Sequence, residues 1–250
     1  MYNHIVNKTR IALIIILLVF FGGSYFFTKR SEAPTIPTTS KSPATITTLP
    51  HTDFREISKG DTSKRQAIIT IDAGFGDRSA EGLLTALAKH QIKATFFLVG
   101  QWVEEHPELT RRIAREGHEI FNHSYSHPDY TTLTSLEIKA DLQKMDDVLF
   151  TTVGIRTRPY YRAPSGARNA AVNSAAALAG YQHIYWSLDP QDWRLDVSGE
   201  TTKNRVLSNI HPGAIILLHI ADSATGDIAD ELFTALEEKG YKLVSLTEGL

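Results

Sequence analysis

Residues 67–74 read AIITIDAG, a short apolar run that ends in an acidic residue and a glycine. Such a nearly continuous run of aliphatic residues is typical of a strand buried on both faces, as in a parallel sheet covered by helices. The glycine indicates a turn directly after the strand. This stretch therefore predicts a central strand that presents the carboxylate of Asp72 at its end.

From this strand to the C-terminus, short apolar runs alternate with amphipathic segments. The alternation favours an α/β domain of mainly parallel strands, which we place at residues 65–250. The predicted strands are 67–72, 94–99, 119–122, 159–162, 183–187, 214–218 and 242–245.

Capping residues indicate where two of the intervening helices begin. Thr134 and Glu137 have the spacing of a capping box, in which each side chain bonds the backbone N–H of the other residue. Ser79 precedes apolar residues at helical spacing, and we expect its hydroxyl to cap that helix. Both starts place helices between consecutive strands.

The N-terminal segment has a different composition. Residues 11–27 contain no charged residue and are flanked on both sides by lysine and arginine. As a helix they would be about 26 Å long, just short of a typical hydrocarbon core of about 30 Å. We expect residues 1–30 to form a transmembrane anchor, with a cleaved signal peptide as the alternative.

Residues 31–64 are rich in proline, threonine and serine, and they contain few large apolar residues. This composition is typical of a flexible, extended stalk. Anchor and stalk together predict a single-pass protein of the cell membrane with an extracellular domain. If the first segment is a signal peptide, the protein is secreted.

Charge and cysteine content exclude several classes of function. The formal net charge is −2 over 250 residues, so the chain lacks the basic excess of nucleic-acid-binding proteins, and we expect no nucleic-acid partner. There is no cysteine, which excludes disulfides, thiolate metal sites and a cysteine nucleophile. Any metal must be held by histidine, aspartate, glutamate or backbone oxygen. The sequence gives no indication of oligomeric state.

Polar side chains follow several of the predicted strands. In α/β folds of this kind, catalytic groups gather at the C-terminal ends of the strands. The candidates at five strand ends are Asp72, His123, Arg162, Asp192 and His219. We therefore expect these side chains to meet at one rim of the sheet.

The histidine pair lies in residues 122–129, which read NHSYSHPD. The serines and Pro128 favour a turn over a helix here. A turn can bring the imidazoles of His123 and His127 together as ligands of Zn²⁺ or a similar divalent ion, which polarises a carbonyl group. Two exposed loop histidines are the alternative reading of the same spacing.

The remaining candidates form two plausible pairs. Asp72 follows apolar residues, and Arg162 can hold its carboxylate as a general base, or the two can form a structural ion pair. Asp192 can fix the tautomer of His219, which could then donate a proton to a leaving group. A core histidine satisfied by backbone groups is the alternative for His219, and Trp193 fits either the core or a pocket wall.

Five segments, taken in order, carry a resemblance. They are residues 70–74 (TIDAG), 123–127 (HSYSH), 162–166 (RAPSG), 189–193 (DPQDW) and 217–219 (LLH). Together they resemble the five motifs of the polysaccharide deacetylases, carbohydrate esterase family four, which share the NodB-homology domain. The resemblance extends over residues 66–248. It implies a distorted (β/α) barrel that removes acetyl groups from N-acetylated sugars with a divalent metal ion, Zn²⁺ preferred and Co²⁺ or Mn²⁺ as alternatives.

The resemblance also implies roles for the catalytic residues. Two side chains would hold the metal, one would be the base, one would be the acid, and two would orient the base and the acid. In that order they are His123 and His127, Asp72, His219, and Arg162 and Asp192.

Three further residues would meet the substrate. The backbone N–H of Ser165 would help to stabilise the tetrahedral oxyanion. Leu217 would line the pocket for the acetyl methyl group, and Trp193 would form part of the sugar site.

Two positions depart from the family motifs. The first motif usually reads Thr-Phe-Asp-Asp-Gly, and its second aspartate is the third protein ligand, whereas this chain has Ala73. Because a methyl group cannot coordinate a cation, metal affinity should be weaker unless water, Asp77 or Asp72 takes the position. Ser165 replaces an aromatic residue, which keeps the backbone donor and opens that side of the groove.

Anchor, stalk and motifs together predict a membrane-tethered, metal-dependent hydrolase. Its expected reaction is deacetylation of N-acetylated cell-wall polysaccharide, with the amino sugars of peptidoglycan as substrate. Ala73 leaves open a catalytically weakened carbohydrate-binding module. The shared mechanism also leaves open an O-acetyl esterase of the xylan type.

Overall fold

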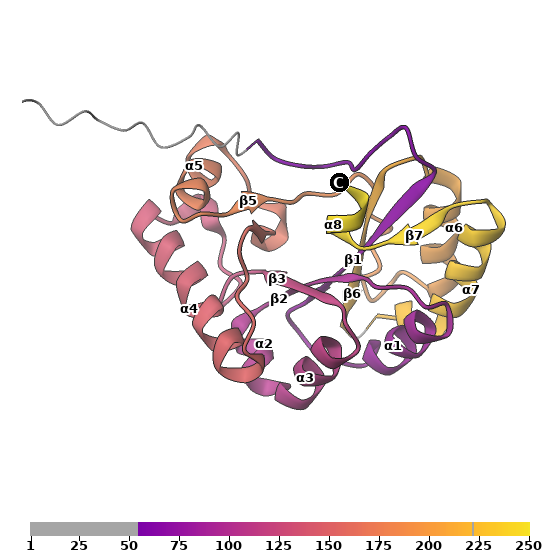
Figure 1. Cartoon of the computed structure of the whole chain (residues 1–250), viewed down its shortest axis with the longest axis horizontal. Helices are drawn as coiled ribbons and strands as arrows, with labels where there is room; N and C mark the ends of the chain where they lie inside the picture. Colours follow the sequence, from indigo (N-terminus) through magenta and orange to yellow (C-terminus); the bar gives the residue numbers. More distant parts are fainter. Residues whose placement is uncertain (1–54, 222) are drawn as a thin grey trace, which may run out of the picture. The chain divides into compact units, whose positions relative to one another are not determined.

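The computed structural model describes residues 55–221 and 223–250, all within one compact unit. Within these residues, seven strands form a single sheet in which neighbouring strands run parallel (Figure 1). The strand order is β5-β4-β3-β2-β1-β6, and β7 pairs separately with β1. The strands are β1 Gln66–Ala73, β2 Thr95–Leu98, β3 Glu119–Asn122, β4 Tyr160–Tyr161, β5 Gln182–His183, β6 Ala214–Ile220 and β7 Lys242–Val244.

Strand β1 is the centre of the sheet. All its residues after Gln66 are buried, as the aliphatic run predicted. One edge of β1 pairs with β6, while the other pairs first with β7 and then with β2. In the pairing with β6, Asp72 lies opposite His219. Two adjacent strand ends therefore deliver a carboxylate and an imidazole side by side.

The sheet is curled, and the chain after β5 crosses between its two edge strands. Ile184 donates its N–H to the carbonyl oxygen of Tyr161 at 2.8 Å, and Leu188 forms a parallel bridge with Ile216 in β6. The strand predicted at 183–187 is wrong beyond its first residue, because β5 ends at His183 and the following residues bridge rather than pair continuously. The predicted distorted barrel is thus a curled half-barrel of parallel strands.

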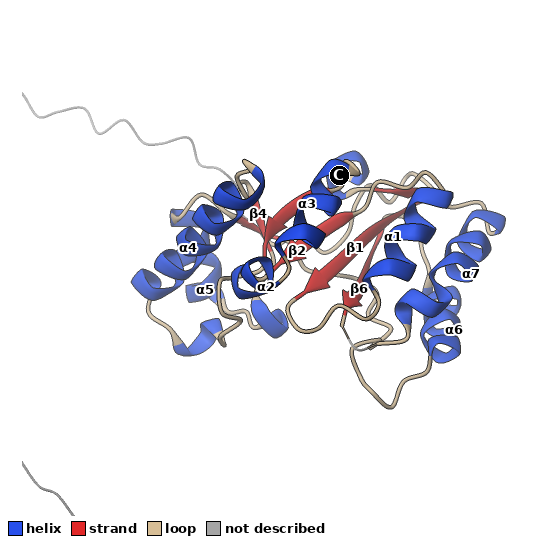
Figure 2. Cartoon of the chain, turned by 90° about the horizontal axis from the view of Figure 1, so that it is seen from below, coloured by secondary structure: helices blue, strands red, loops and turns tan. Residues whose placement is uncertain are grey.

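Helices surround the strands, as Figure 2 shows. Helix α7 packs against α1 and α6, and α4 packs against α2, α3 and α5. The α-helices are α1 Ala80–Lys89, α2 Gly100–Glu105, α3 Pro107–Arg115, α4 Ser135–Val153, α5 Ala170–Leu178, α6 Gly199–Asn209, α7 Thr225–Glu238 and α8 Leu246–Gly249, and the 3₁₀ turns are η1 Tyr130–Thr132 and η2 Pro164–Gly166.

The two capping predictions have different outcomes. At the start of α4, the predicted capping box is present, with Glu137 N–H donating to the Thr134 hydroxyl and the Glu137 carboxylate accepting from Thr134 N–H. Ser79 does precede α1, but the prediction that its hydroxyl caps the helix is wrong. That hydroxyl donates to the carbonyl oxygen of Ser223 at 2.7 Å. The Ser79 hydroxyl thus bonds a residue distant in the sequence instead of the first turn of its own helix.

The predicted anchor and most of the predicted stalk, residues 1–54, lie outside the described residues. The described end of the stalk contacts the sheet: Ile57 donates its N–H to the carbonyl oxygen of His183 at 2.9 Å, and Lys59 bridges Ala214. None of the helices formed by residues 55–221 and 223–250 has the length and apolarity needed to cross a bilayer.

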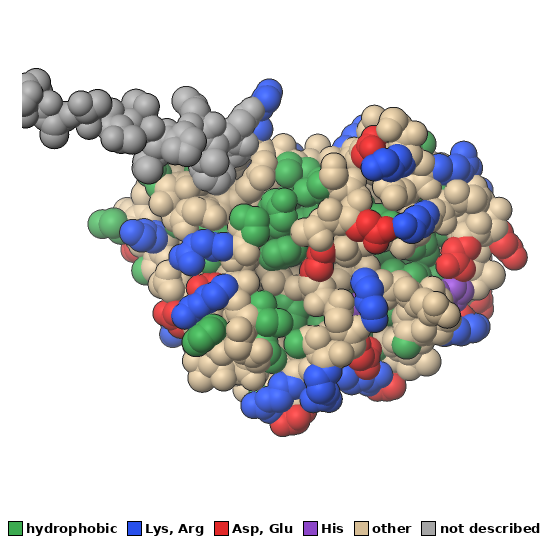
Figure 3. Space-filling model, viewed as in Figure 1, with side chains coloured by type: hydrophobic (Ala, Val, Ile, Leu, Met, Phe, Trp, Pro, Cys, Tyr) green, Lys and Arg blue, Asp and Glu red, His purple; other side chains and the backbone are tan. Residues whose placement is uncertain are grey.

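Charges of both signs are interspersed on the face of the molecule that Figure 3 shows. Lysine and arginine side chains alternate there with aspartate and glutamate, and apolar side chains lie between them. The electrostatic potentials of mixed charges largely cancel at long range, so this face does not present a continuous basic region.

An ion-pair network links α1 to α7 and makes stability depend on pH. His90 lies between Asp230 and Glu237, with ring nitrogens 2.9 and 2.8 Å from their carboxylate oxygens. Burial alone would lower the pKa of His90, but the two carboxylates raise it above the ordinary value of 6.5. A raised pKa stabilises the fold fully below the pKa of the unfolded chain, and this contribution is lost as pH rises through the folded value.

We expect His90→Gln to destabilise the protein by about 0.2–1 kcal/mol near pH 5.5, since both carboxylates are about half exposed to solvent. The difference from the unchanged protein should shrink as pH rises toward 9, because His90 loses its proton as pH passes its raised pKa. Urea denaturation at both pH values measures it, with His211→Gln as the control. An equal loss of stability at the two pH values would contradict this assignment.

Candidate active site

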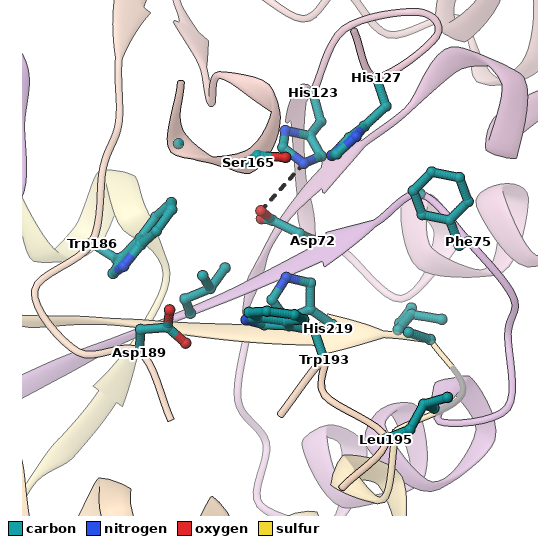
Figure 4. Close-up of a pocket in the computed structure, with 15 residues that line it drawn as sticks. Asp72, Phe75, His123, His127, Ser165, Trp186, Asp189, Trp193, Leu195 and His219 are labelled. Carbon is teal, nitrogen blue, oxygen red and sulfur yellow. Dashed lines mark ion pairs between the residues drawn. The ribbon is translucent and has the colours of Figure 1, made fainter. Parts of the chain in front are cut away.

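A cavity of about 610 Å³ opens at the carboxyl ends of β1, β3 and β6 (Figure 4). Most of the predicted site residues line it, and the other two, Arg162 and Asp192, are buried. The lining residues are Asp72, Gly74, Phe75, His123, His127, Ser165, Gly166, Trp186, Asp189, Trp193, Leu195, Leu217, His219, Ile220 and Ala221. The structure therefore brings the predicted residues together at one place.

The carboxylate of Asp72 is held by Arg162, as predicted. Arg162 Nη1 donates to Asp72 Oδ1 at 2.6 Å, and the arginine side chain is 0% exposed. Burial alone would raise the pKa of Asp72, but the charge of Arg162, with smaller contributions from His123 and His219, lowers it below the ordinary value. Asp72 is therefore ionised, and its second oxygen, Oδ2, faces His123.

Arg162 makes further hydrogen bonds that fix its orientation. Its Nη2 donates to the hydroxyl of Thr70 at 3.0 Å and to the carbonyl oxygen of Tyr185 at 3.2 Å. Its Nε donates to the carbonyl oxygen of Ile184 at 3.3 Å, and its guanidinium lies 4.2 Å from the ring centre of Phe97. A buried cation with this many acceptors has little freedom to move, so Asp72 is held as well.

The turn predicted between the two histidines is present and converges their rings. Ser124 and His127 have positive φ angles of 73° and 56°, a conformation that non-glycine residues adopt only when other contacts hold them. The Asn122 side chain accepts from Ser124 N–H at 2.9 Å, and the Ser124 hydroxyl accepts from His127 N–H at 2.9 Å. The ring centres of His123 and His127 are 5.0 Å apart.

Both imidazoles of the pair are neutral. His123 Nδ1 donates to the carbonyl oxygen of Arg162 at 2.9 Å, which leaves Nε2 unprotonated and 3.4 Å from Asp72 Oδ2. Burial lowers the pKa of His123. For His127, burial and the neighbouring His123 lower the pKa to about 4. Neutral imidazole is the form that coordinates a metal ion.

His219 is paired with Asp192, also as predicted. Its Nδ1 lies 2.8 Å from Asp192 Oδ1, and its backbone N–H donates to Oδ2 of the same carboxylate at 2.9 Å. Burial alone would lower the pKa of His219, but the charge and hydrogen bond of Asp192 raise it. The pair thus favours the protonated form of an imidazole at the cavity wall, opposite Asp72 (Figure 4).

The three predicted substrate residues also line the cavity. Ser165 lies in η2 with a φ of 52°, and its side chain is exposed. Leu217 is 3% exposed, which makes it a buried part of the wall. Trp193 is 52% exposed, so the structure places it at the pocket rather than in the core.

The donor set matches a divalent cation in chemistry, with one anionic ligand fewer than the family motif supplies. Ala73 is fully buried in the apolar core, and Asp77, which lies 3.6 Å from His106, does not line the cavity. Within the described part of the chain, no three His, Cys, Asp or Glu side chains are positioned together to hold a metal ion.

Sequence reasoning missed several residues of the site. The Thr225 hydroxyl donates to Asp192 Oδ2 at 2.5 Å from the start of α7. Asp189 lines the cavity, and burial raises its pKa. Phe75 and Trp186 line it too. Asp189 and Phe75 were detectable as residues inside or next to predicted motifs, whereas Thr225 carried no local signal.

Loss of the Arg162 charge should strongly destabilise the protein. Arg162→Leu leaves Asp72 as a buried carboxylate without its counter-ion, at a cost of about 3–5 kcal/mol. Urea denaturation measures this cost. The double variant Asp72→Leu/Arg162→Leu should recover part of it, because both buried charges are then absent.

Arg168→Leu is the matched control, since that arginine is partly exposed and pairs with Glu56 at 3.1 Å. It should cost about 0–1 kcal/mol. Equal losses for Arg162→Leu and Arg168→Leu would mean that the buried pair does not stabilise the site.

The sequence matches known proteins over most of its described length. Residues 59–184 match the polysaccharide deacetylase family. The uncharacterised protein YlxY of Bacillus subtilis is 38% identical over 192 residues, which cover 77% of this chain and 59% of YlxY. The chain thus spans less than two thirds of that relative. The peptidoglycan-N-acetylmuramic acid deacetylase PdaA of Bacillus subtilis is 31% identical over 191 residues, 76% of this chain and 73% of PdaA.

Solved structures have the same fold. Wild-type BA3943 of Bacillus anthracis, described as a CE4 family pseudoenzyme, superposes with a TM-score of 0.73 at 34% identity, covering 78% of this chain and 68% of its own. A mutant of BA3943 is described as having restored enzymatic activity. The structure of PdaA superposes with a TM-score of 0.75 at 30% identity, covering 78% of this chain and 85% of its own. On the family match, these identities and the shared fold, the chain belongs to the polysaccharide deacetylases of carbohydrate esterase family four.

Proposed function

We propose that this protein hydrolyses the acetamido groups of an N-acetylated cell-wall polysaccharide, with the amino sugars of peptidoglycan as substrate. The observation that carries the proposal is the pairing of two acid–base groups across one cavity. Arg162 lowers the pKa of Asp72 from one side of the cavity, and Asp192 raises the pKa of His219 from the other. A base and an acid with pKa values pushed apart are what amide hydrolysis at neutral pH requires.

Each group has a defined part in the reaction. Asp72 takes a proton from the attacking water as its oxygen bonds to the acetyl carbon. His219 then gives a proton to the sugar nitrogen as the carbon–nitrogen bond breaks, so the products are acetate and a free amino sugar. The backbone N–H of Ser165 faces the oxyanion, and Leu217 receives the acetyl methyl group. Arg162 and Asp192 position the base and the acid without touching substrate.

His123 and His127 would hold a divalent cation, Zn²⁺ preferred and Co²⁺ or Mn²⁺ as alternatives. Two observations support this assignment. Both imidazoles are neutral, and the Nδ1 of His123 is bonded to the Arg162 carbonyl oxygen, which leaves its Nε2 available to a cation. Such an ion supplies Lewis acidity, which polarises the acetyl carbonyl and makes water more acidic. Because Ala73 supplies no carboxylate, we propose that the ion is bound more weakly than in relatives that have aspartate there.

The absence of that carboxylate leaves a second candidate open, a carbohydrate-binding protein with little catalysis. The likeness to BA3943, a described pseudoenzyme, supports this alternative. An O-acetyl esterase of the xylan type would use the same residues and is distinguished by its substrate alone. Activity and glycan binding therefore have to be measured on the same protein.

The full-length chain should release acetate from N-acetylglucosamine oligomers or peptidoglycan when Zn²⁺, Co²⁺ or Mn²⁺ is added. His219→Ala should lower the rate by about 10²–10⁴-fold, because the leaving nitrogen loses its acid. Ala73→Asp should raise the rate at limiting metal by about tenfold or more. An enzymatic acetate assay measures the rates of the unchanged protein and of both variants.

Glycan binding by the unchanged protein without acetate release, with activity only in Ala73→Asp, would favour the binding protein. Acetate released only from acetylated xylan would favour the esterase. The surface variant Leu178→Ala is the control and should leave the rate unchanged, since Leu178 is exposed on α5 away from the cavity.

We further propose that residues 11–27 anchor the protein in the cell membrane and that the catalytic domain is extracellular. Two arginines in this segment, Ile15→Arg and Leu18→Arg, should each cost about 2.5–3.5 kcal/mol of membrane insertion. Fractionation should therefore move the protein from the membrane to the soluble fraction. A shortened chain found only in the medium would support a cleaved signal peptide instead.

A further inference from the structure

Three exposed apolar side chains gather at the mouth of the cavity. Phe75 is 69% exposed, Trp193 is 52% exposed and Leu195 is 85% exposed, and all three line the cavity. We name this set the apolar rim (Figure 4). Among the described residues, four other large apolar side chains are exposed to a similar degree, and none of those four lines the cavity. Exposed apolar surface concentrated at one site indicates a binding surface.

The rim is attached to well-fixed parts of the fold. Phe75 follows β1, and its ring meets the His127 ring edge-on with centres 5.4 Å apart. The next residue, Gly76, accepts a hydrogen bond through its carbonyl oxygen from the buried Trp102 at 2.8 Å. On the other side, Trp193 directly follows Asp192, which is bonded to His219. Both sides of the rim therefore have a defined position relative to the reacting groups.

The cavity walls carry acidic side chains and, among the residues that the structure describes, no lysine or arginine. The acidic residues are Asp72 and Asp189, and the neighbouring Arg162 is fully buried and bonded to Asp72. Arg194 lies between two rim residues in the sequence, but its guanidinium bonds both carboxylate oxygens of Asp196 at 2.9 and 2.8 Å. The cationic group on these described walls is the imidazole of His219, whose Nδ1 is already bonded to Asp192, so an anionic ligand would meet no lysine or arginine there. A metal ion on the histidines would act at the acetyl carbonyl and not at the rim.

We propose that the apolar rim determines specificity by binding the faces of uncharged pyranose rings, so that the site selects N-acetylglucosamine over N-acetylmuramic acid. The two sugars differ by a lactyl ether that carries a carboxylate. The inference rests on the proposed function, since it names which amino sugar is the substrate. The C–H groups on the face of a pyranose ring form an apolar surface that packs on aromatic and aliphatic side chains. The muramic acid carboxylate would lose water beside Asp189 without gaining a lysine or arginine as a partner.

This preference differs from the one in the name of PdaA, an N-acetylmuramic acid deacetylase. At 31% identity, a change in the residues at the mouth of the pocket is compatible with a shared reaction centre. The rim, rather than the acid and base, is therefore the part of the site to vary in a test.

Binding of two matched probes to the full-length chain tests the proposal by calorimetry at low salt. One is chitotetraose, and the other is an unsubstituted tetrasaccharide of alternating N-acetylglucosamine and N-acetylmuramic acid. Chitotetraose should bind about tenfold tighter or more. Amidation of the lactyl carboxylates should recover most of the difference, because it removes the charge and keeps the bulk.

Variants of the rim give the second part of the test. Phe75→Ala and Leu195→Ala should each weaken chitotetraose binding by about fivefold or more. The matched controls are Phe150→Ala and Leu178→Ala, which remove exposed side chains of the same types elsewhere and should change nothing. Leu195→Lys should shift preference toward the acidic tetrasaccharide, and Leu178→Lys should not.

Equal or tighter binding of the acidic probe, or no difference between rim and control variants, would overturn the proposal. Failure of both probes to bind would overturn it too. Binding is measured independently of acetate release. The specificity proposal and the deacetylase proposal can therefore be contradicted independently of each other. Selective binding without acetate release leaves the rim assignment standing, and acetate release without selectivity leaves the deacetylase standing.

Discussion

The site depends on one buried cation, the guanidinium of Arg162. A fully buried arginine is tolerated only where its donors find acceptors, and here they bond Asp72, Thr70 and two backbone carbonyl oxygens. Those acceptors lie on β1 and on the segment that follows β5. The carbonyl oxygen of Arg162 in turn accepts from His123, at the end of β3. A single residue thus fixes three separated parts of the chain, and with them the base and one candidate metal ligand.

Two charged pairs then set opposite protonation states at neighbouring strand ends. Asp72 and His219 are register partners in β1 and β6, yet the first has a lowered pKa and the second a raised one. Arg162 lowers the pKa of Asp72, and Asp192 raises the pKa of His219. Each of these effects opposes that of burial. The sheet supplies proximity, and the buried partners supply the difference in acidity that acid–base catalysis needs.

The sequence was sufficient wherever the signal was local. The aliphatic run of β1, the capping box at Thr134 and the polar residues at strand ends all depend on neighbours within a few positions, and the structure has them where they were predicted. The predictions that failed, and the residues that were missed, depend on contacts between residues distant in the sequence. The Ser79 hydroxyl bonds Ser223, and Thr225 bonds Asp192, across separations that no local pattern records. The strand predicted at 183–187 failed for a similar reason, because those residues bridge two edges of a curled sheet.

Ala73 places a methyl group at the end of β1, where the family motif has a carboxylate. Its position is fully buried, and a carboxylate there would have to be neutralised, since an unpaired buried charge costs several kcal/mol. In a chain with aspartate at this position, a bound cation would provide that neutralisation, and metal binding and local stability would then be coupled. The methyl group of Ala73 removes the requirement, and β1 needs no ion to complete its core. The neutral imidazoles of His123 and His127 still present nitrogens that could coordinate an ion, and the proposed ion would then bind to a site that is already folded.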